Sequence, residues 1–354
     1  MQKKISMADF HSLSIKTISR LTSDAIAITF DIPEPLKEIF QFLPGQYVTL
    51  KTTLDGKEVR RAYSICSTPQ SGVLKVAVKA VADGTFSVYA NTQLQEGDQL
   101  EVHPPEGKFV INPSDTSKTY AAFAAGSGIT PIMSMIKTVL ETTPDSKFVL
   151  IYGNKRKEDV IFREELLALR ESYNERFSIE WIYSQSREDN AHFGRISKPT
   201  VNFVVKNKYA DWNFDNYYLC GPEPMINEVS TVLQENGTPE NQISFELFTS
   251  SDEGEVTEAL DGQAAVHIIV DGETHDVTMP QNTIILDAAL EADIDAPHSC
   301  QGGICSSCIA RITEGAATMR KNQILTDREV AEGLILTCQA HPTSAKVVVD
   351  YDDV

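Results

Sequence analysis

The chain has 354 residues, which is enough for two or three domains that each bury a core of their own. Its formal net charge is −19, and this charge is unevenly distributed. Residues 1–248 hold 26 Lys and Arg against 31 Asp and Glu, whereas residues 249–354 hold 5 against 19. The acidic C-terminal part argues against nucleic acid as a partner, because phosphates would be repelled. It is either a surface that steers a basic protein partner or an ordinary solvated surface.

The first residues lack the apolar run of a signal peptide, so a cytoplasmic protein is expected. Residues 119–136 carry no charge, but Gly126, Gly128 and Pro131 interrupt this stretch. A membrane span needs about 20 predominantly apolar residues, so a buried strand, loop and helix is the better interpretation. No membrane insertion is therefore expected.

The N-terminal part has the pattern of short β-strands. Residues 12–18 and 25–30 alternate apolar with polar or small side chains, as half-buried strands do. Turn signals such as Pro44-Gly45, Asp55-Gly56 and Asp83-Gly84 separate further strands. This spacing predicts a β-barrel domain over residues 8–113.

The middle part, residues 114–248, alternates strands with helices, which predicts an α/β domain with a parallel sheet. Strands are expected at residues 148–152, 178–183 and 217–220, and helices at residues 160–170 and 224–234. Residues 249–260 have almost no bulky apolar side chain and are interpreted as an acidic linker.

The last part, residues 261–354, is predicted to be a separate α+β domain. A hairpin is expected between residues 265–270 and 274–278, around Asp271-Gly272, followed by a helix over residues 285–292.

Four cysteines in this last part carry the strongest signal. Cys300, Cys305 and Cys308 are spaced C-x4-C-x2-C, and Cys338 follows after 29 residues. This is the ligand spacing of a plant-type [2Fe–2S] cluster, whose thiolates hold two irons. The alternatives are a structural zinc site, which usually has two short ligand pairs, and disulfides, which would imply secretion.

Four further motifs follow one another in the first 248 residues. They are Arg61-Ala-Tyr-Ser64, Gly84-Thr-Phe-Ser87, Ala124-Ala-Gly-Ser-Gly-Ile-Thr-Pro131 and Cys220-Gly-Pro222. Taken alone, the first motif could be explained structurally, with Arg61 in a surface ion pair and Tyr63 in the barrel core. Because the four motifs occur in this order, the chain closely resembles the ferredoxin–NADP reductase family. With the cysteine motif added, it resembles the oxygenase-reductase branch of that family, which has a plant-type ferredoxin domain at the C-terminus.

The resemblance implies that the barrel binds FAD. Arg61 is expected on the pyrophosphate, Tyr63 on the isoalloxazine and Ser64 near flavin N5. Main-chain N–H groups and a hydroxyl at a helix N-terminus should also hold the pyrophosphate, and a neighbouring strand should line the ribityl or adenine side. The residues concerned are Gly84, Thr85, Phe86 and Ser87 for the helix, and Val78 and Lys79 for the strand.

The resemblance implies that the α/β domain binds NAD(P)H. The pyrophosphate is assigned to Gly126, Gly128, Thr130 and Pro131, with Thr130 as helix N-cap and Pro131 as first helical residue. Cys220, Gly221 and Pro222 are expected near the nicotinamide, although Cys220 could also be an ordinary core cysteine. Ser186 and Arg187 follow a strand where NADPH-using members hold the 2′-phosphate, so NADPH is expected, with NADH possible.

At the end of the α/β domain, Phe248 is assigned to stacking at the flavin edge and Glu246 to a polar or proton-relay role. A plain final strand would also explain both. The catalytic set implied by the resemblance is Tyr63, Ser64, Cys220 and Glu246.

The resemblance implies an NAD(P)H oxidoreductase that passes electrons through FAD to a [2Fe–2S] cluster and on to a separate protein. That acceptor is expected to be a multicomponent oxygenase such as the phenylacetyl-CoA epoxidase. A fatty-acid desaturase or ring-hydroxylating dioxygenase remains open as acceptor. A redox-sensing regulator, or a flavin diaphorase with structural zinc, also remains open as the function.

Overall fold

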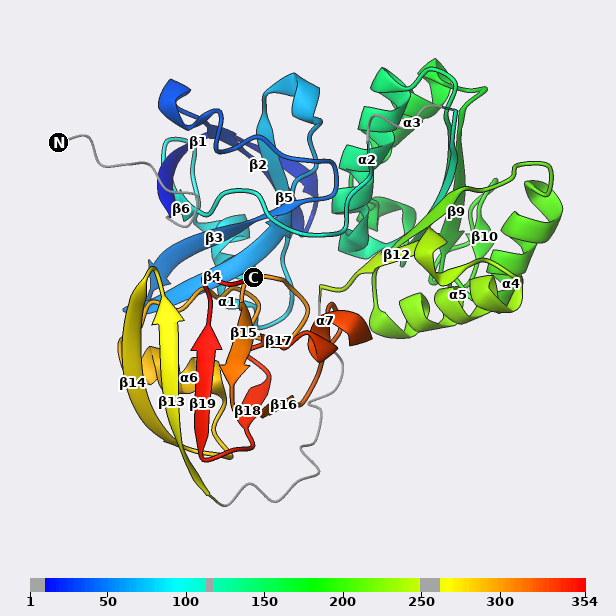
Figure 1. Cartoon of the computed structure of the whole chain (residues 1–354). Helices are drawn as coiled ribbons and strands as arrows, with labels where there is room; N and C mark the ends of the chain where they lie inside the picture. Colours follow the sequence, from blue (N-terminus) through cyan, green and yellow to red (C-terminus); the bar gives the residue numbers. More distant parts are fainter. Residues whose placement is uncertain (1–9, 113–116, 249–261) are drawn as a thin grey trace. The chain divides into compact units, whose positions relative to one another are not determined.

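The computed structural model describes residues 10–112, 117–248 and 262–354 (Figure 1). The chain divides into two compact units, Met1–Phe248 and Thr249–Val354. The predicted linker, residues 249–260, lies outside the described residues.

The first part of unit 1 is a closed antiparallel barrel. Its strands follow the order β4-β3-β6-β1-β2-β5. An antiparallel bridge between Ile65 and Val76, and a 2.8 Å hydrogen bond from the Cys66 N–H to the Lys75 carbonyl, join the end of β4 to β5 and close the sheet. The elements are β1 (His11–Thr22), β2 (Ala25–Asp31), η1 (Glu34–Leu36), β3 (Tyr47–Leu54), β4 (Lys57–Ser64), η2 (Pro69–Ser71), β5 (Leu74–Lys79), α1 (Thr85–Thr92) and β6 (Gln99–Val102).

The alternation read from the sequence builds this barrel. Leu13 and Ile15 of β1 are buried, whereas the alternating residues Ser12 and Ser14 are not. Because successive side chains of a strand point to opposite faces, the apolar set fills the barrel interior. The predicted barrel is confirmed.

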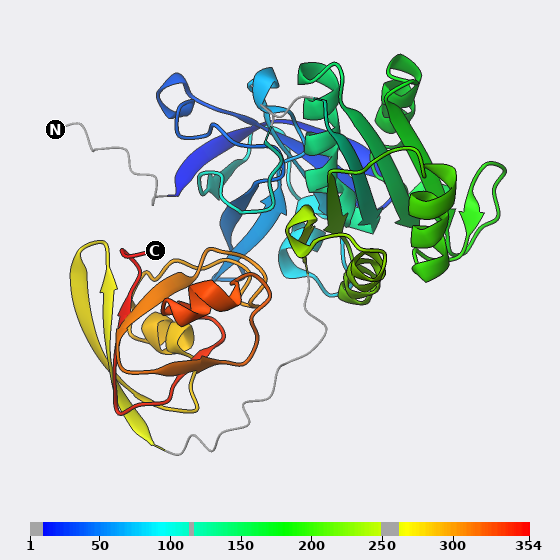
Figure 2. The same ribbon diagram turned by 45° about the vertical axis from the view of Figure 1, so that its right-hand side comes forward.

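The second part of unit 1 is a parallel sheet with the strand order β10-β9-β8-β7-β11-β12. Helices α2 and α3 lie on one side of the sheet, and α4 and α5 lie on the other (Figures 1 and 2). The strand order reverses between β7 and β11, which makes a topological switch point where ligands of such sheets bind. The elements are β7 (Thr119–Ala125), η3 (Gly126–Gly128), α2 (Ile129–Thr142), β8 (Lys147–Asn154), η4 (Lys157–Asp159), α3 (Arg163–Ser172), β9 (Phe177–Tyr183), β10 (His192–Phe193), α4 (Lys198–Asn202), η5 (Phe203–Lys208), β11 (Asn216–Cys220), α5 (Glu223–Glu235), η6 (Glu240–Gln242) and β12 (Ile243–Glu246).

The uncharged stretch over residues 119–136 is the predicted strand, loop and helix, and no helix among the described residues is long and apolar enough to cross a membrane. The start of α2 was predicted wrongly. Gly128, at φ −60° and ψ −7°, already has helical backbone angles, so the η3 turn runs straight into a helix that begins at Ile129. Thr130 is therefore not the N-cap, and its hydroxyl donates instead to the Ser127 carbonyl at 3.1 Å. Pro131 occupies the third helical position.

The helix predicted over residues 160–170 begins later, at Arg163. Phe162 has a left-handed backbone, with φ +61°, which keeps the preceding residues out of the helix. The helix predicted over residues 224–234 corresponds to α5.

Unit 2 is a β-grasp-like domain in which α6 packs against one face of a mixed sheet (Figures 1 and 2). The sheet order is β14-β13-β19-β15-β17, and β16 pairs separately with β18. The predicted hairpin is confirmed, with both Asp271 and Gly272 at positive φ as a two-residue type I′ turn requires. The elements are β13 (Gln263–Val270), β14 (Glu273–Pro280), α6 (Ile285–Glu291), β15 (Ile309–Glu314), β16 (Ala317–Met319), α7 (Asp327–Ala331), β17 (Leu334–Leu336), β18 (Ala340–Pro342) and β19 (Lys346–Asp350).

Candidate cofactor sites

Three predicted residues meet at the carboxyl edge of the parallel sheet. Cys220, the last residue of β11, is in register with Glu246, the last residue of β12. The Ser64 hydroxyl, at the end of barrel strand β4, donates to the Glu246 carboxylate at 3.1 Å. The barrel and the α/β domain thus each contribute to one polar group beside the switch point.

This group is electrostatically unusual because it is desolvated. Burial raises the pKa of the Glu246 carboxyl to about 8, although the Ser64 hydrogen bond opposes the shift. Burial also raises the pKa of the fully buried Cys220 thiol well above its ordinary value, and the charge of Glu246 raises it further. At neutral pH the carboxyl and the thiol therefore both keep their protons.

The glycine-rich loop between β7 and α2 approaches this group with its backbone. A Cβ at Gly128 would lie 2.1 Å from the Cys220 carbonyl oxygen, and one at Gly221 would lie 3.1 Å from the Ala125 Cβ. Gly126 has φ +55°, and its carbonyl accepts a 2.8 Å hydrogen bond from the Tyr152 hydroxyl. The approach of Gly128 to the Cys220 carbonyl explains why this position must lack a side chain.

Thr130 and Pro131 follow this loop in the first turn of α2, and both are buried. Because they are buried, their side chains are less available to a ligand than their main-chain atoms. The Ile129 N–H already donates to the Ser127 carbonyl of the preceding turn, and Pro131 has no N–H, so the start of α2 offers an anion few free donors.

On the barrel side, Tyr63 is half-buried, and its ring centroid lies 5.5 Å from that of Phe86. Burial raises the pKa of the Tyr63 hydroxyl, so the phenol stays neutral. Arg61, two residues earlier, is exposed and donates to the Arg60 carbonyl at 2.7 Å. The position of Tyr63 is compatible both with core packing and with a ring stacked upon it.

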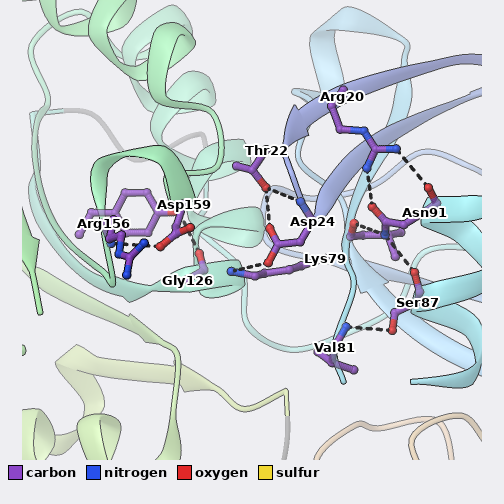
Figure 3. Close-up of polar contacts among 12 residues, drawn as sticks. Arg20, Thr22, Asp24, Lys79, Val81, Ser87, Asn91, Gly126, Arg156 and Asp159 are labelled. Atoms are coloured by element: carbon purple, nitrogen blue, oxygen red, sulfur yellow. Dashed lines mark hydrogen bonds and ion pairs between the residues drawn. The ribbon is translucent and has the colours of Figure 1, made fainter. Parts of the chain in front are cut away.

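Figure 3 shows how the start of α1 is held against strand β5. The Ser87 hydroxyl accepts the Val81 N–H at 3.3 Å, and the Asn91 amide donates to the carbonyls of Ser87 and Val78 at 2.9 and 3.1 Å. Arg20 donates to the Asn91 amide oxygen at 3.0 Å. These contacts fix the turn at Gly84 and present the N–H groups at the start of α1.

Two predicted FAD residues on β5 are placed differently from one another. The Val78 side chain is fully buried in the barrel core, so only its main chain is available to a ligand. Lys79 is partly exposed and forms an ion pair with Asp24 at 3.5 Å (Figure 3). Sequence reasoning missed Arg20, Asp24 and Asn91, because their contacts join positions that carry no local motif.

At the other end of the same sheet edge, Ser186 and Arg187 follow β9. The Ser186 hydroxyl oxygen is buried and has no hydrogen-bond partner among the described residues. The exposed Arg187 guanidinium lies 4.4 Å from the centroid of the Phe193 ring. A buried hydroxyl without a partner, beside an exposed cation, fits a polar anionic ligand.

Phe248 packs as a partly buried aromatic against the core that includes Cys220. It therefore lies in the same core as the carboxyl-edge group, although the structure shows no ring stacked on it among the described residues.

In unit 2 the four cysteines of the motif lie together. Cys300 contacts both Cys305 and Cys338, and Cys308 contacts Cys338. The hydrogen bond with Cys300, together with burial, raises the pKa of the Cys305 thiol well above its ordinary value. Crowded thiols of this kind keep their protons unless cations replace them, so the loop fits a cationic iron group.

The contacts form two pairs, Cys300 with Cys305 and Cys308 with Cys338, joined between Cys300 and Cys338. Across residues 10–112, 117–248 and 262–354, no group of three or more His, Cys, Asp or Glu side chains is arranged to hold a metal ion. All six cysteines of the chain are free thiols, so the disulfide alternative is wrong.

The backbone of this loop is tightly turned. Gln301 and Gly303 have φ +53° and +71°, and the Gly302 N–H donates to the Cys300 sulfur at 3.3 Å. The Gln339 amide donates to the carbonyls of Gln301 and Cys338 at 3.1 and 2.8 Å, and so ties the loop to the turn between β17 and β18 that carries the fourth cysteine. Sequence reasoning missed Gln339, for which adjacency to Cys338 was the only available signal.

Comparison with known proteins gives the same three parts. Residues 12–111 match the oxidoreductase FAD-binding domain, residues 123–231 the oxidoreductase NAD-binding domain, and residues 268–343 the 2Fe-2S iron-sulfur cluster binding domain. The expected cofactors FAD, NAD(P)H and [2Fe–2S] are confirmed at the level of these domains. The match to a 2Fe-2S domain also decides against the structural zinc alternative.

Similar proteins span the whole chain. A subunit of the 1,2-phenylacetyl-CoA epoxidase of Escherichia coli strain K12 is 38% identical over 352 residues, which cover 98% of this chain and 99% of that protein. The 3-ketosteroid-9-alpha-monooxygenase ferredoxin reductase component of Rhodococcus rhodochrous is 33% identical over 353 residues, covering 96% of each. The solved structure of phthalate dioxygenase reductase matches with a TM-score of 0.62 and 25% identity, covering 96% of this chain and 98% of that one.

These matches confirm the resemblance drawn from the motifs and the predicted fold class. Three domains in one order, with a relative of 38% identity along nearly the full length, are shared with proteins that reduce oxygenases. The chain therefore belongs to the family of NAD(P)H-dependent flavin and iron–sulfur oxidoreductases that serve as reductase components of oxygenase systems.

Proposed function

We propose that this protein delivers electrons from NADPH to a multicomponent oxygenase of the phenylacetyl-CoA epoxidase type. The structural observation that carries the electron-transfer assignment is the Ser64–Glu246 hydrogen bond beside Cys220, in a chain that also holds the four-thiol loop. The choice of acceptor follows the 38% identity to the phenylacetyl-CoA epoxidase component over the whole chain. That acceptor would place the protein in phenylacetate catabolism.

When bound, FAD accepts a hydride from the nicotinamide and the [2Fe–2S] cluster carries electrons singly, which is chemistry that side chains do not supply. The chain's own task is to bind and orient these groups. For FAD, the proposed residues are Arg61 on the pyrophosphate, Tyr63 and Phe248 as stacking rings, Ser64 near the reactive edge, Val78 and Lys79 on the ribityl or adenine side, and Gly84, Thr85, Phe86 and Ser87 at the start of α1.

The geometry of α1 refines this assignment. The Gly84 N–H already donates to the Val81 carbonyl at 3.1 Å, and the Ser87 hydroxyl accepts the Val81 N–H. Helix geometry leaves the N–H groups of Thr85, Phe86 and Ser87 without acceptors inside the helix. These three main-chain groups are thus the donors that we assign to the pyrophosphate.

At the carboxyl edge, Ser64, Cys220 and Glu246 are assigned to the hydride-transfer site. The protonated Glu246 carboxyl would supply a proton at this site, and Ser64 holds that carboxyl in place. Cys220, Gly221 and Pro222 would lie against the nicotinamide of a bound nucleotide, and Gly128, where the Cys220 carbonyl excludes a side chain, would take its pyrophosphate. Gly126, Thr130 and Pro131 complete that phosphate loop.

NADPH is the proposed donor because Ser186 and Arg187 would supply the donors that a 2′-phosphate needs. The buried Ser186 hydroxyl has no partner among the described residues, and the exposed guanidinium of Arg187 can pair with a phosphate at two points. NADH remains the second candidate.

Cys300, Cys305, Cys308 and Cys338 are the proposed cluster ligands. The domain limits that we propose are residues 8–113, 114–248, 249–260 and 261–354. The division of the chain into two compact units after Phe248 supports the boundary between residues 248 and 249. The cytoplasm is the proposed compartment, because none of the six cysteines is in a disulfide, which is usual in reducing surroundings.

An anaerobic titration of the full chain with NADPH, followed by visible absorbance, tests the electron path. Flavin bands and the iron–sulfur absorbance should bleach together. Bleaching of the flavin alone would leave a diaphorase, and no bleaching would overturn the nicotinamide assignment.

Reconstitution identifies the acceptor. The protein should couple NADPH oxidation to product formation with a phenylacetyl-CoA epoxidase. Coupling only with a desaturase or a ring-hydroxylating dioxygenase would refute the proposed acceptor. Slow turnover, with partner binding that depends on redox state, would instead favour a redox-sensing regulator.

A further inference from the structure

A chain of two hydroxyl groups leads from the last strand of unit 2 into the cysteine loop. Tyr351 follows β19 directly, and its hydroxyl donates to the Thr337 hydroxyl oxygen at 2.9 Å. The Thr337 hydroxyl in turn donates to the Cys308 carbonyl oxygen at 3.0 Å. The Thr337 N–H donates to the same carbonyl at 3.1 Å, so this oxygen receives two donors from one residue.

All three residues are buried, with Thr337 fully so. The backbone N–H of Tyr351 donates to the Ile269 carbonyl at 2.9 Å, which fixes where the side chain enters the core. Packing alone would be served by a phenylalanine at this position, because the ring lies among apolar side chains. The hydroxyl is therefore the part of Tyr351 that packing does not explain.

The direction of the two bonds has an electrostatic consequence. In both, the hydrogen points toward Cys308, so the positive ends of both O–H dipoles face the cysteine loop. Hydrogen-bond donors and dipoles around a cluster favour its more negative state and raise its reduction potential. Thr337 also precedes Cys338, so the same residue links the cysteines of one contact pair.

We propose that Tyr351 is a positioning residue of the cluster, acting through Thr337 to hold Cys308 and Cys338 and to raise the cluster's reduction potential. This inference rests on the proposed cluster ligands. Tyr351 itself touches none of the reacting groups.

The test is the midpoint potential of the cluster in the full-length holoprotein, measured by an anaerobic dye-mediated titration and accompanied by the EPR spectrum of the reduced cluster. Tyr351→Phe and Thr337→Val should both shift the potential to more negative values. Because the two hydroxyls act in series, the double variant should shift no further than Thr337→Val alone. Thr337→Ser keeps the hydroxyl and should therefore have the same potential as the wild type.

Thr278→Val is the matched control. Thr278 lies on β14, the outermost strand of the sheet, and its substitution should leave both the potential and the EPR spectrum unchanged. Potentials are read on the iron-loaded fraction, with iron per chain and melting temperature measured alongside.

An unshifted potential in loaded Tyr351→Phe overturns the proposal, even if the melting temperature falls, because the tyrosine would then only stabilise the fold. Fully additive shifts in the double variant also overturn it. Iron and sulfide analysis of the wild-type chain tests the cluster assignment separately. Absence of iron and sulfide from the wild-type chain would overturn both the cluster assignment and the role of Tyr351. An unshifted potential in loaded Tyr351→Phe overturns only the role of Tyr351.

Discussion

The Ser64 hydroxyl donates a 3.1 Å hydrogen bond to the Glu246 carboxylate, across 182 positions of the chain. Ser64 ends a strand of the barrel, and Glu246 ends a strand of the parallel sheet. The bond therefore joins the two domains at the edge where the cofactor residues gather. The raised pKa of Glu246 means that this junction holds a proton near neutral pH.

Glu246→Gln should flatten the pH dependence of stability in the flavin-depleted chain. The pKa of the carboxyl is raised from 4.5 to about 8, so between these values the unfolded chain releases a proton that the folded chain keeps. The free energy of unfolding therefore falls as pH rises from about 4.5 to about 8 and levels off above it. A shift from 4.5 to about 8 corresponds to a total effect of about 4–5 kcal/mol on the free energy of unfolding.

Urea unfolding from pH 5 to 9 measures this slope. The variant should lack the decline, whereas Glu240→Gln, at an exposed position, should retain it. Equal slopes in the wild type and in Glu246→Gln would show that the carboxyl titrates normally.

Gly128→Ala should weaken NAD(P)H binding. The added Cβ would lie 2.1 Å from the Cys220 carbonyl oxygen, so the phosphate loop and the end of β11 would have to separate. We expect the Kd for NADPH to rise at least tenfold, which corresponds to about 1.4 kcal/mol, while FAD content stays unchanged. Ser127→Ala, in the same loop, should bind normally, and equal affinities for both variants would mean that the loop does not contact the nucleotide.

The sequence predicted those features whose signal is local. Alternating side chains identified the barrel strands, Asp271-Gly272 identified a hairpin, and the spacing of Cys300, Cys305 and Cys308 identified the cluster loop. Each of these depends on residues that are neighbours in the chain.

Contacts between distant positions could not be predicted in this way. Asn91 reaches Arg20, and Tyr351 reaches Thr337, only after the chain has folded. The prediction of where α2 begins was wrong for a different reason. A good N-cap residue, Thr130, was present, but the preceding turn at Gly128 already had helical angles and made that cap unnecessary.

Cys305→Ser should abolish the cluster while leaving flavin chemistry intact. Serine is a poor substitute for a thiolate ligand, and the two units of the chain are separately compact. Iron content and the iron–sulfur absorbance should be lost, but NADPH should still bleach the flavin. Cys66→Ala, which removes a buried cysteine of unit 1, should retain the full iron content. Loss of iron in both variants would indicate a general folding defect.

Arg187→Ala should reduce the preference for NADPH over NADH. A charged hydrogen bond contributes about 1.5–3 kcal/mol, so its loss should raise the KM for NADPH at least tenfold. The KM for NADH should stay nearly constant, because NADH lacks the 2′-phosphate. Arg187→Lys keeps the charge but loses the two-point contact, so it should fall between the wild type and the alanine variant.

The control is Arg170→Ala, which removes an exposed arginine from α3. It should leave both KM values unchanged. Equal increases for NADPH and NADH in Arg187→Ala would mean that the guanidinium only supports Phe193, whose ring centroid lies 4.4 Å from it. An unchanged ratio would therefore remove the structural reason for choosing NADPH, because the buried Ser186 hydroxyl alone carries no charge to distinguish the two nucleotides.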